Sequence, residues 1–467
     1  MARPALLLIS PPVVDGQRWW ANRTANKPHL ASLAGYVRDL ALPRLLELDL
    51  ETQTPLETLL AEVDRALTPD VALVGLSAWT SMHFLGTRAV AERIRALRPG
   101  LPIVIGGHHA TAVPEDFPAA LCDYLIEGDG EHPLRSLCER LPLARPAKRT
   151  VTRGAPFDQS NPSHIDWDTY GRPGAKERAL WVGTSRGCAF QCSYCVEPGR
   201  GANYSRYEVD TQLDILEQLL ALHGPSVIAF SDPLFGANRR WLESFLGGLE
   251  RRKLPLLFWC ETRADLMTRE LLERFKRCGF TVDFGLDTGS AAMVQRMHKA
   301  AIPEVYLARS KQTLEDANAV GLHHGVYLIF NYPGETPETV AETKAYVDSI
   351  GAGGGPMSGW LSAQSFFILP GTASYRAMAE DAARYGTEIR QPGWWRQRGD
   401  HHTMATDIVP SAAWRGREGE LTAFFQWNEA VNARWTQRYP LDVMQFRYLY
   451  YYGNTGGTVS AAEGILL

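Results

Sequence analysis

Apolar segments of strand length alternate with amphipathic segments of helical length over the first 140 residues of this chain. The strands are expected at residues 5–10, 44–50, 71–78, 101–107 and 123–131, and the helices at 29–41, 54–67, 84–100 and 132–141. Strands that follow one another through short loops and a helix pair in parallel and need helices on both faces of their sheet. The alternation therefore predicts a doubly wound, Rossmann-like α/β domain over residues 1–140.

A second run of the same alternation begins after residue 176. Its strands are expected at 179–185, 226–232, 256–263, 281–287 and 323–331, and its helices at 209–224, 239–252, 268–279, 305–321 and 336–351. Five or six consecutive βα units predict a partial (β/α)6 barrel over residues 177–385, with its chemistry at the carboxyl ends of the strands. Residues 141–176 are rich in proline and charge and lack apolar periodicity, so we expect an interdomain linker there.

The alternation stops near residue 385, and aromatic residues dominate residues 386–467. They include Trp394, Trp395, Trp414, Trp427, Trp435, Tyr439, Phe446, Tyr448, Tyr450, Tyr451 and Tyr452. We expect a small, mostly helical C-terminal element with a helix near 416–438. Aromatic residues at this density more often form a core between packed elements, although they could also stack on a substrate.

Composition excludes several classes of protein. A chain of 467 residues exceeds one hydrophobic core and divides into domains. A net charge of -4 carries no excess basicity, so nucleic acid is not an expected partner. No stretch approaches the roughly 20 apolar residues of a membrane-spanning helix, and the first residues lack the features of a signal peptide. We therefore expect a cytoplasmic protein without a membrane partner.

Three of the seven cysteines lie within eight residues, in the sequence SRGCAFQCSYC. Cys188, Cys192 and Cys195 follow the first expected barrel strand in a C-x3-C-x2-C spacing. One short loop can wrap three thiolates around a [4Fe–4S] cluster, whereas a zinc site normally needs a fourth ligand. Three ligands leave one iron open to the amino and carboxylate groups of S-adenosylmethionine (SAM). The alternatives are a chance grouping or a zinc site completed by a distant histidine.

At this loop the sequence resembles the radical SAM superfamily, whose signature is this spacing with an aromatic residue before the third cysteine, here Tyr194. The segments FSDPLFGANRRW, ETRADL, FGLDTGS and YLIFNYPGETPETVAET are similar to successive strand-end motifs of that superfamily. The resemblance implies a SAM pocket lined by Tyr194, Ser231, Asp232, Arg263 and Asp287. Two features depart from the family pattern: Asp287 stands where many relatives carry Glu, and Asn331-Tyr332 replace a small apolar pair. Asp232 and Asp287 could instead cap helices.

The first domain also resembles a known module. The segments ISPPVV, HLASLAGYVRDL, VGLSAWTSM, VIGGHHATAVPED and IEGDGE are similar to the cobalamin-binding domain that precedes many radical SAM enzymes. The resemblance implies cobalamin contacts from Ser77, Trp79, Thr80, Ser81, Gly106, Gly107, His108, Gly128, Gly130 and Glu131. The loop DGQRWW lacks the D-x-H-x-x-G motif, through which other cobalamin proteins supply a histidine to cobalt. We therefore expect cobalt to lack that axial imidazole. Trp79 or Trp20 could shield the metal or join the core, and the domain could also hold no cofactor.

Together the two resemblances imply an enzyme with a [4Fe–4S] cluster, SAM and cobalamin. Its expected activity is methylation of an unactivated carbon in a peptide or a small natural-product intermediate, with a flavodoxin or ferredoxin as electron donor. The substrate would lie between two facing sets of strand ends. Cyclisation or rearrangement without methyl transfer is one alternative, and a cofactor-binding sensor without turnover is another. A methylthiotransferase would carry three further cluster cysteines in its first domain.

Overall fold

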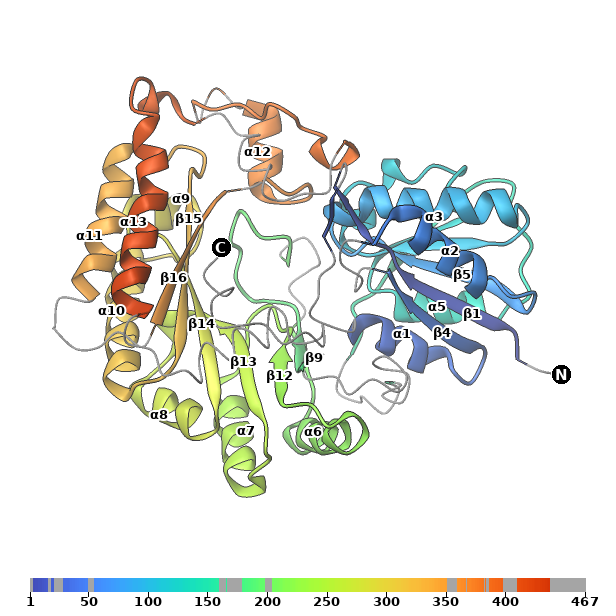
Figure 1. The fold of residues 1–467 in the computed structure, drawn as a ribbon, viewed down its shortest axis with the longest axis horizontal. Coiled ribbons are helices and arrows are strands. Elements are labelled where there is room, and N and C mark those ends of the chain that lie inside the picture. Colours follow the sequence, from blue (N-terminus) through green and yellow to red (C-terminus); the bar gives the residue numbers. More distant parts are fainter. Residues whose placement is uncertain are drawn as a thin grey trace.

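The structure is a computed structural model. It describes residues 3–15, 18–20, 28–48, 54–158, 165, 179–197, 204–350, 359–366, 368–381, 383, 386–397 and 410–436. Two parallel sheets dominate these residues, each with its own helices (Figure 1). Within these ranges, no helix is both long and apolar enough to cross a membrane.

The first sheet has the strand order β4-β1-β5-β6-β7-β8, and all its pairs are parallel. Its first five strands in the chain are β1 (Ala5–Ser10), β4 (Leu42–Glu47), β5 (Val71–Ser77), β6 (Ile103–Gly106) and β7 (Tyr124–Gly128). Its long helices are α1 (Pro28–Val37), α2 (Leu56–Ala66), α3 (Phe84–Leu97) and α5 (Glu131–Cys138), with the short α4 (His108–Ala112) after β6. The predicted doubly wound domain is confirmed.

Alternate side chains of β1 show why this sheet needs two layers of helices. Leu6 and Leu8 pack in one cluster with residues of α1 and α5, whereas Leu7 and Ile9 pack in another with α2 and α3. Because successive side chains point to opposite faces, a strand that is apolar at every position requires cover on both sides. The strand order reverses between β1 and β5, and the crevice outside the strand ends at such a point is the usual ligand site.

Two small features of the first domain were not expected. Residues 150–154 lie inside the expected linker, yet they form β8 (Thr150–Gly154), which pairs with β7 along its full length. Its sequence TVTRG is mostly polar and exposed because β8 is an edge strand, so an apolar pattern does not reveal it. A hairpin of β2 (Val13–Asp15) and β3 (Arg18–Trp20) follows β1.

The second sheet has the strand order β16-β15-β14-β13-β12-β9, again parallel throughout. Its strands are β9 (Ala179–Val182), β12 (Val227–Phe230), β13 (Leu257–Thr262), β14 (Phe280–Asp287), β15 (His324–Phe330) and β16 (Gly359–Ser365). Its helices are α6 (Val209–His223), α7 (Arg239–Arg252), α8 (Arg269–Arg277), α9 (Ala291–Arg296), α10 (Pro303–Val320) and α11 (Pro337–Ile350). Six strands in chain order confirm the partial barrel. The pair β10 (Ser185–Arg186) and β11 (Ser205–Arg206) lies beside it.

The C-terminal residues cover an edge of the barrel. Helix α13 (Gly419–Thr436) lies within the helix expected at 416–438 and packs against β16. Asn432 accepts a hydrogen bond from Leu361 N at 2.8 Å and donates one to Leu361 O at 2.6 Å, and Asn428 accepts one from Ala363 N at 3.2 Å. These amides satisfy backbone groups that an edge strand would otherwise leave unpaired.

Several C-terminal aromatic residues form a core between packed elements, which is the interpretation that aromatic residues at this density favour over stacking on a substrate. Trp394, Trp395 and Trp414 are almost fully buried. Trp395 donates to Asp116 of the first domain at 2.6 Å, so the segment after α12 (Ala373–Asp381) joins the two domains. Figure 1 shows α12 and this segment spanning the two sheets on one side. Tyr439, Phe446 and the tyrosines of 448–452 lie outside the described residues, as do residues 159–164 and 166–178 of the expected linker.

Candidate functional site

A cavity of about 610 Å³ lies between the two domains. Its wall on the first domain includes the ends of β5, β6 and β7 at Ser77, Gly106 and Gly128. Its wall on the barrel includes Ser231, just after β12, and Glu261 of β13. The carboxyl ends of the two sheets therefore face one shared space, as expected from the sequence.

Eight of the ten residues expected to contact cobalamin line this cavity. They are Ser77, Trp79, Gly106, Gly107, His108, Gly128, Gly130 and Glu131. The other two have neighbours elsewhere: Thr80 Oγ1 lies 2.9 Å from His83 Nδ1, and Ser81 Oγ lies 2.9 Å from His109 Nδ1. Ser81 and His109 are buried inside the domain. The run from Ser77 to Ser81 thus leaves the strand and turns away from the cavity.

Glycine backbone forms much of the cavity wall on the first domain. Gly107 has a φ of 111°, and a Cβ there would lie 2.5 Å from Ala78 O. Gly128 has a φ of 80°. Only glycine adopts such conformations readily, and the absence of side chains lets a large ligand approach the strand ends. This wall fits a corrinoid, although the contacts themselves stay a prediction.

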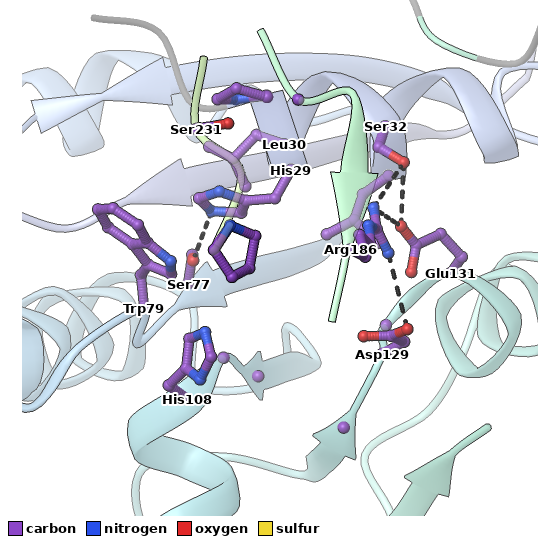
Figure 2. Close-up of a pocket in the computed structure, with 18 of the residues that line it drawn as sticks. His29, Leu30, Ser32, Ser77, Trp79, His108, Asp129, Glu131, Arg186 and Ser231 are labelled. Atoms are coloured by element: carbon purple, nitrogen blue, oxygen red, sulfur yellow. Dashed lines mark hydrogen bonds and ion pairs between the residues drawn. The ribbon is translucent and has the colours of Figure 1, made fainter. Parts of the chain in front are cut away.

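His29 of α1 is a cavity residue that sequence reasoning missed. Its Nε2 lies 2.9 Å from Ser77 Oγ, and its ring stacks on Trp79 at 5.8 Å between centroids (Figure 2). Trp79 lines the cavity and is not part of the fully buried core. The side chain of Trp20 lies outside the described residues. His29 begins the segment HLASLAGYVRDL, which resembles the cobalamin-binding domain, but it was not among the residues expected to contact cobalamin.

Arg186 links the first domain to the loop that carries the cysteines. Its guanidinium lies 2.5 Å from Glu131 Oε1 and 3.8 Å from Asp129 Oδ2 (Figure 2). Ser32 of α1 also donates to Glu131 Oε1, at 2.9 Å. Burial opposes the charge of Arg186, but the two carboxylates raise its pKa above the ordinary value. Glu131 therefore lines the cavity while already ion-paired across the domain boundary.

The three cysteines lie in the loop after β9, and all three thiols are partly buried and free of disulfides. Cys195 lines the cavity. Burial raises the pKa of the Cys195 thiol to about 12, and it also raises the pKa of Cys188. Metal binding deprotonates such thiols outright, so their burial does not prevent them from binding a cluster. Among the described residues, no three His, Cys, Asp or Glu side chains surround a single metal ion. A cubane differs from such a site because each thiolate binds its own iron.

Backbone and hydroxyl contacts hold the cluster loop at Ser193. Its N–H donates to Met297 O at 3.0 Å, and its carbonyl accepts from Ser374 N at 2.8 Å. Its hydroxyl lies 2.7 Å from Tyr332 OH. Tyr332, one of the residues that depart from the family pattern, therefore supports the loop from the end of β15.

Asp232 braces the start of the same loop. It accepts hydrogen bonds from Thr184 Oγ1 at 2.6 Å and Ser185 Oγ at 2.5 Å. Burial raises its pKa to about 6, against the effect of these donors. Asp232 and Ser231 both line the cavity beside Cys195, so two of the expected SAM residues lie there. No hydrogen bond from a following helix to Asp232 is seen in the described residues, so the bracing of the loop explains its place better than a cap.

The other three expected SAM residues gather behind the cluster loop, outside the lining of this cavity. Tyr194 OH donates to Asp287, and Lys299 Nζ lies 2.6 Å from Asp287 Oδ2. Arg263 donates to Asp265 at 2.9 Å and to Lys299 O at 2.8 Å, with its guanidinium 3.9 Å from the Phe190 ring. Burial, followed by the charge of Asp287, raises the pKa of Tyr194 well above its usual value. Lys299 was missed because no motif surrounds it.

Comparison with known proteins agrees with this geometry. Residues 182–347 match the model of the radical SAM superfamily, and residues 28–138 match that of the B12 binding domain. An uncharacterized methyltransferase of Pyrococcus horikoshii is 24% identical over 74% of this chain and 78% of its own. The anaerobic magnesium-protoporphyrin IX monomethyl ester cyclase of Rubrivivax gelatinosus is 23% identical over 67% of this chain and 60% of its own.

Among solved structures, the fold is similar to TsrM, a radical SAM methyltransferase of Kitasatospora setae. Its structure with tryptophan substrate and a SAM analog has a TM-score of 0.68 at 20% identity, covering 91% of this chain and 89% of that one. Its structure with cobalamin and a [4Fe–4S] cluster has a TM-score of 0.63 at 21% identity, covering 83% and 77%. Both family matches fall on the two domains that meet at the cavity. The chain therefore joins a B12 binding domain to a radical SAM domain, the combination of domains that characterises cobalamin-dependent radical SAM enzymes.

Proposed function

We propose that this enzyme methylates a carbon atom of a small molecule or of a short peptide segment held in the interdomain cavity. When bound, the cluster and SAM supply a radical, and cobalamin supplies the methyl group. The observation that carries the proposal is the shared cavity: Cys195 of the cluster loop and the glycine wall of the B12 domain line the same space. A substrate in that space is within reach of both domains.

The residues of this chain contribute placement and exclusion of water. Cys188, Cys192 and Cys195 would hold the cluster, and Ser231 and Asp232 would face SAM at the cavity. The Arg186–Glu131 ion pair holds the two walls together at 2.5 Å. A cavity of about 610 Å³ lies within the range of roughly 300–1,000 Å³ that small-molecule sites occupy. This size supports a small substrate.

The proposal extends to the electron donor and the compartment. A flavodoxin or ferredoxin would deliver the electron, and the enzyme would work in the cytoplasm. All seven cysteines are free thiols, which supports a reducing compartment.

The test is anaerobic reconstitution of the full chain with iron, sulfide and hydroxocobalamin, followed by reduction in the presence of SAM. We expect both 5′-deoxyadenosine and S-adenosylhomocysteine. Cys195→Ala should lose the cluster absorbance and both products, whereas Cys278→Ala, a matched change in the outer layer of the barrel, should retain them. Formation of 5′-deoxyadenosine alone would indicate cyclisation or rearrangement. If neither product forms, an enzymatic role is contradicted.

A further inference from the structure

Glu261 occupies an unusual position inside the barrel. It belongs to β13 and lines the interdomain cavity, and its side chain is exposed to that cavity. No hydrogen bond or ion pair to its carboxylate exists among the residues that the structure describes. Burial, followed by the charges of Asp283 and Asp287, raises the pKa of Glu261 to about 7. The carboxylate is thus enclosed by protein yet open to a ligand.

Among the residues that the structure describes, the basic side chains that line the cavity, and Lys299 near it, already have partners. Arg186 pairs with Glu131 and Asp129, and Lys299 pairs with Asp287. Of the two histidines in the lining, His29 lies against Ser77 and His108 lies 3.8 Å from Glu197. An enclosed carboxylate without a counter-charge is costly to the protein. A cationic ligand would remove that cost.

A second carboxylate strengthens the negative charge at this point. Asp283 of β14 stands directly opposite Glu261 in the parallel register. Its Oδ2 accepts hydrogen bonds from Trp259 Nε1 and Tyr327 OH, each at 2.9 Å. These two donors are neutral and hold Asp283 in place beside Glu261.

Aromatic rings lie one inward-facing position below Glu261. Trp181, Ala229 and Trp259 are in register across three neighbouring strands. Because Ala229 is small, the two indole rings meet over it, with centroids 5.5 Å apart and planes at 78°. Both tryptophans line the cavity. A carboxylate above aromatic rings is a favourable environment for an organic ammonium group.

We infer that Glu261 anchors a positively charged nitrogen of the substrate, so that the substrate is an amine or another organic cation. That the bound cation is the substrate rests on the proposed function. The binding of a cation at Glu261 does not depend on it. SAM also carries an ammonium group, and its occupation of Glu261 is the competing outcome that the experiment must separate.

The test measures binding to the reconstituted holoenzyme by equilibrium dialysis under anaerobic conditions. The probes are tryptamine and 3-propylindole, which have the same shape and differ by one ammonium group. We expect the wild-type enzyme to bind tryptamine at least about tenfold more tightly than 3-propylindole. Glu261→Gln should remove that preference and leave the affinity for 3-propylindole within about twofold, which shows that the cavity is intact. Glu243→Gln, an exposed change on α7, should behave as wild type.

Three results would overturn the inference. They are equal or undetectable binding of the two probes by the wild type, an unchanged preference in Glu261→Gln, and a loss of SAM affinity in Glu261→Gln at unchanged tryptamine affinity. None of these measurements requires turnover. If the preference for tryptamine is present but no S-adenosylhomocysteine forms, the proposed methyl transfer is refuted and cation binding at Glu261 stands. If S-adenosylhomocysteine forms but the preference is absent, only cation binding at Glu261 is refuted.

Discussion

The hydroxyl of Tyr332 lies 2.7 Å from the hydroxyl of Ser193, the residue between the second cysteine of the cluster loop and Tyr194. The same phenol lies 2.6 Å from Ser374 Oγ at the start of α12. Tyr332 is buried, and its ring packs against Phe366 at 4.8 Å. One side chain of β15's carboxyl end thus joins the cluster loop to the segment that leads toward the first domain.

Tyr332→Phe should alter the cluster while preserving the fold. The change removes hydrogen bonds to two buried serines, which should lower the free energy of unfolding by about 1–3 kcal/mol. Hydrogen bonding around a cluster also tunes its potential, so we expect a shifted EPR spectrum of the reduced cluster at nearly normal iron content. Tyr346→Phe loses a comparable hydrogen bond, to Leu307 O at 2.7 Å, on an outer helix. It should cost similar stability without any EPR change; an unchanged spectrum in Tyr332→Phe would contradict the prediction.

Glu131→Gln should weaken the contact between the two domains. Among the described residues, the substitution leaves Arg186 with only the more distant Asp129 as a carboxylate partner. Breaking a largely buried ion pair costs several kcal/mol, and we expect a loss of about 3 kcal/mol in urea unfolding together with poorer retention of hydroxocobalamin after desalting. Glu273→Gln breaks the exposed pair with Arg269 and should cost less than about 1 kcal/mol. Equal costs for the two variants would argue against the interdomain role.

Lys299→Met should test how much the ion pair between Lys299 and Asp287, behind the cluster loop, stabilises the protein. Asp287 would lose a partner at 2.6 Å in a buried setting, and the variant should lose about 3–5 kcal/mol of stability. Removing the opposing charge as well, in Lys299→Met with Asp287→Asn, should recover part of that loss. Lys311→Met, at an exposed pair with Glu315 of 3.9 Å, serves as the control. If the double variant is no more stable than Lys299→Met, the charge pair is not the cause.

Glu335 should give the protein a measurable dependence of stability on pH. Burial raises its pKa from 4.5 to about 8, despite the hydrogen bonds from the backbone of Asn331 and Tyr332. Between these values the folded state retains a proton that the unfolded state has released, so the free energy of unfolding falls as pH rises. The slope is at most about 1.4 kcal/mol per pH unit. Glu335→Gln lacks this group, so the stability of wild type relative to the variant should decline across the window; parallel curves in urea unfolding would refute it.

Local pattern predicts much of this protein because the relevant interactions are short in sequence. A strand buried on both faces must be apolar at successive positions, as in residues 5–10, and a helix must repeat its apolar face. The spacing of Cys188, Cys192 and Cys195 lies within one loop. Both domains and the cluster loop could therefore be predicted, and the resemblance to known families implied the cofactor classes. Two strands, β8 and β16, were not predicted. The sequence of β8 is polar because this strand lies on an exposed edge, and β16 carries polar residues that face the inside of the barrel.

Tertiary structure alone decided which polar residues meet. Ser77 and Ser81 are equivalent to a sequence pattern, but one lines the cavity and the other bonds to His109 inside the domain. Arg186 meets Glu131, and Lys299 meets Asp287, through the docking of separate elements. The sequence by itself determined two α/β domains and a three-cysteine loop, since periodicity and spacing are local. The cavity and the charges that face it depend on how two sheets approach each other, which no local pattern encodes.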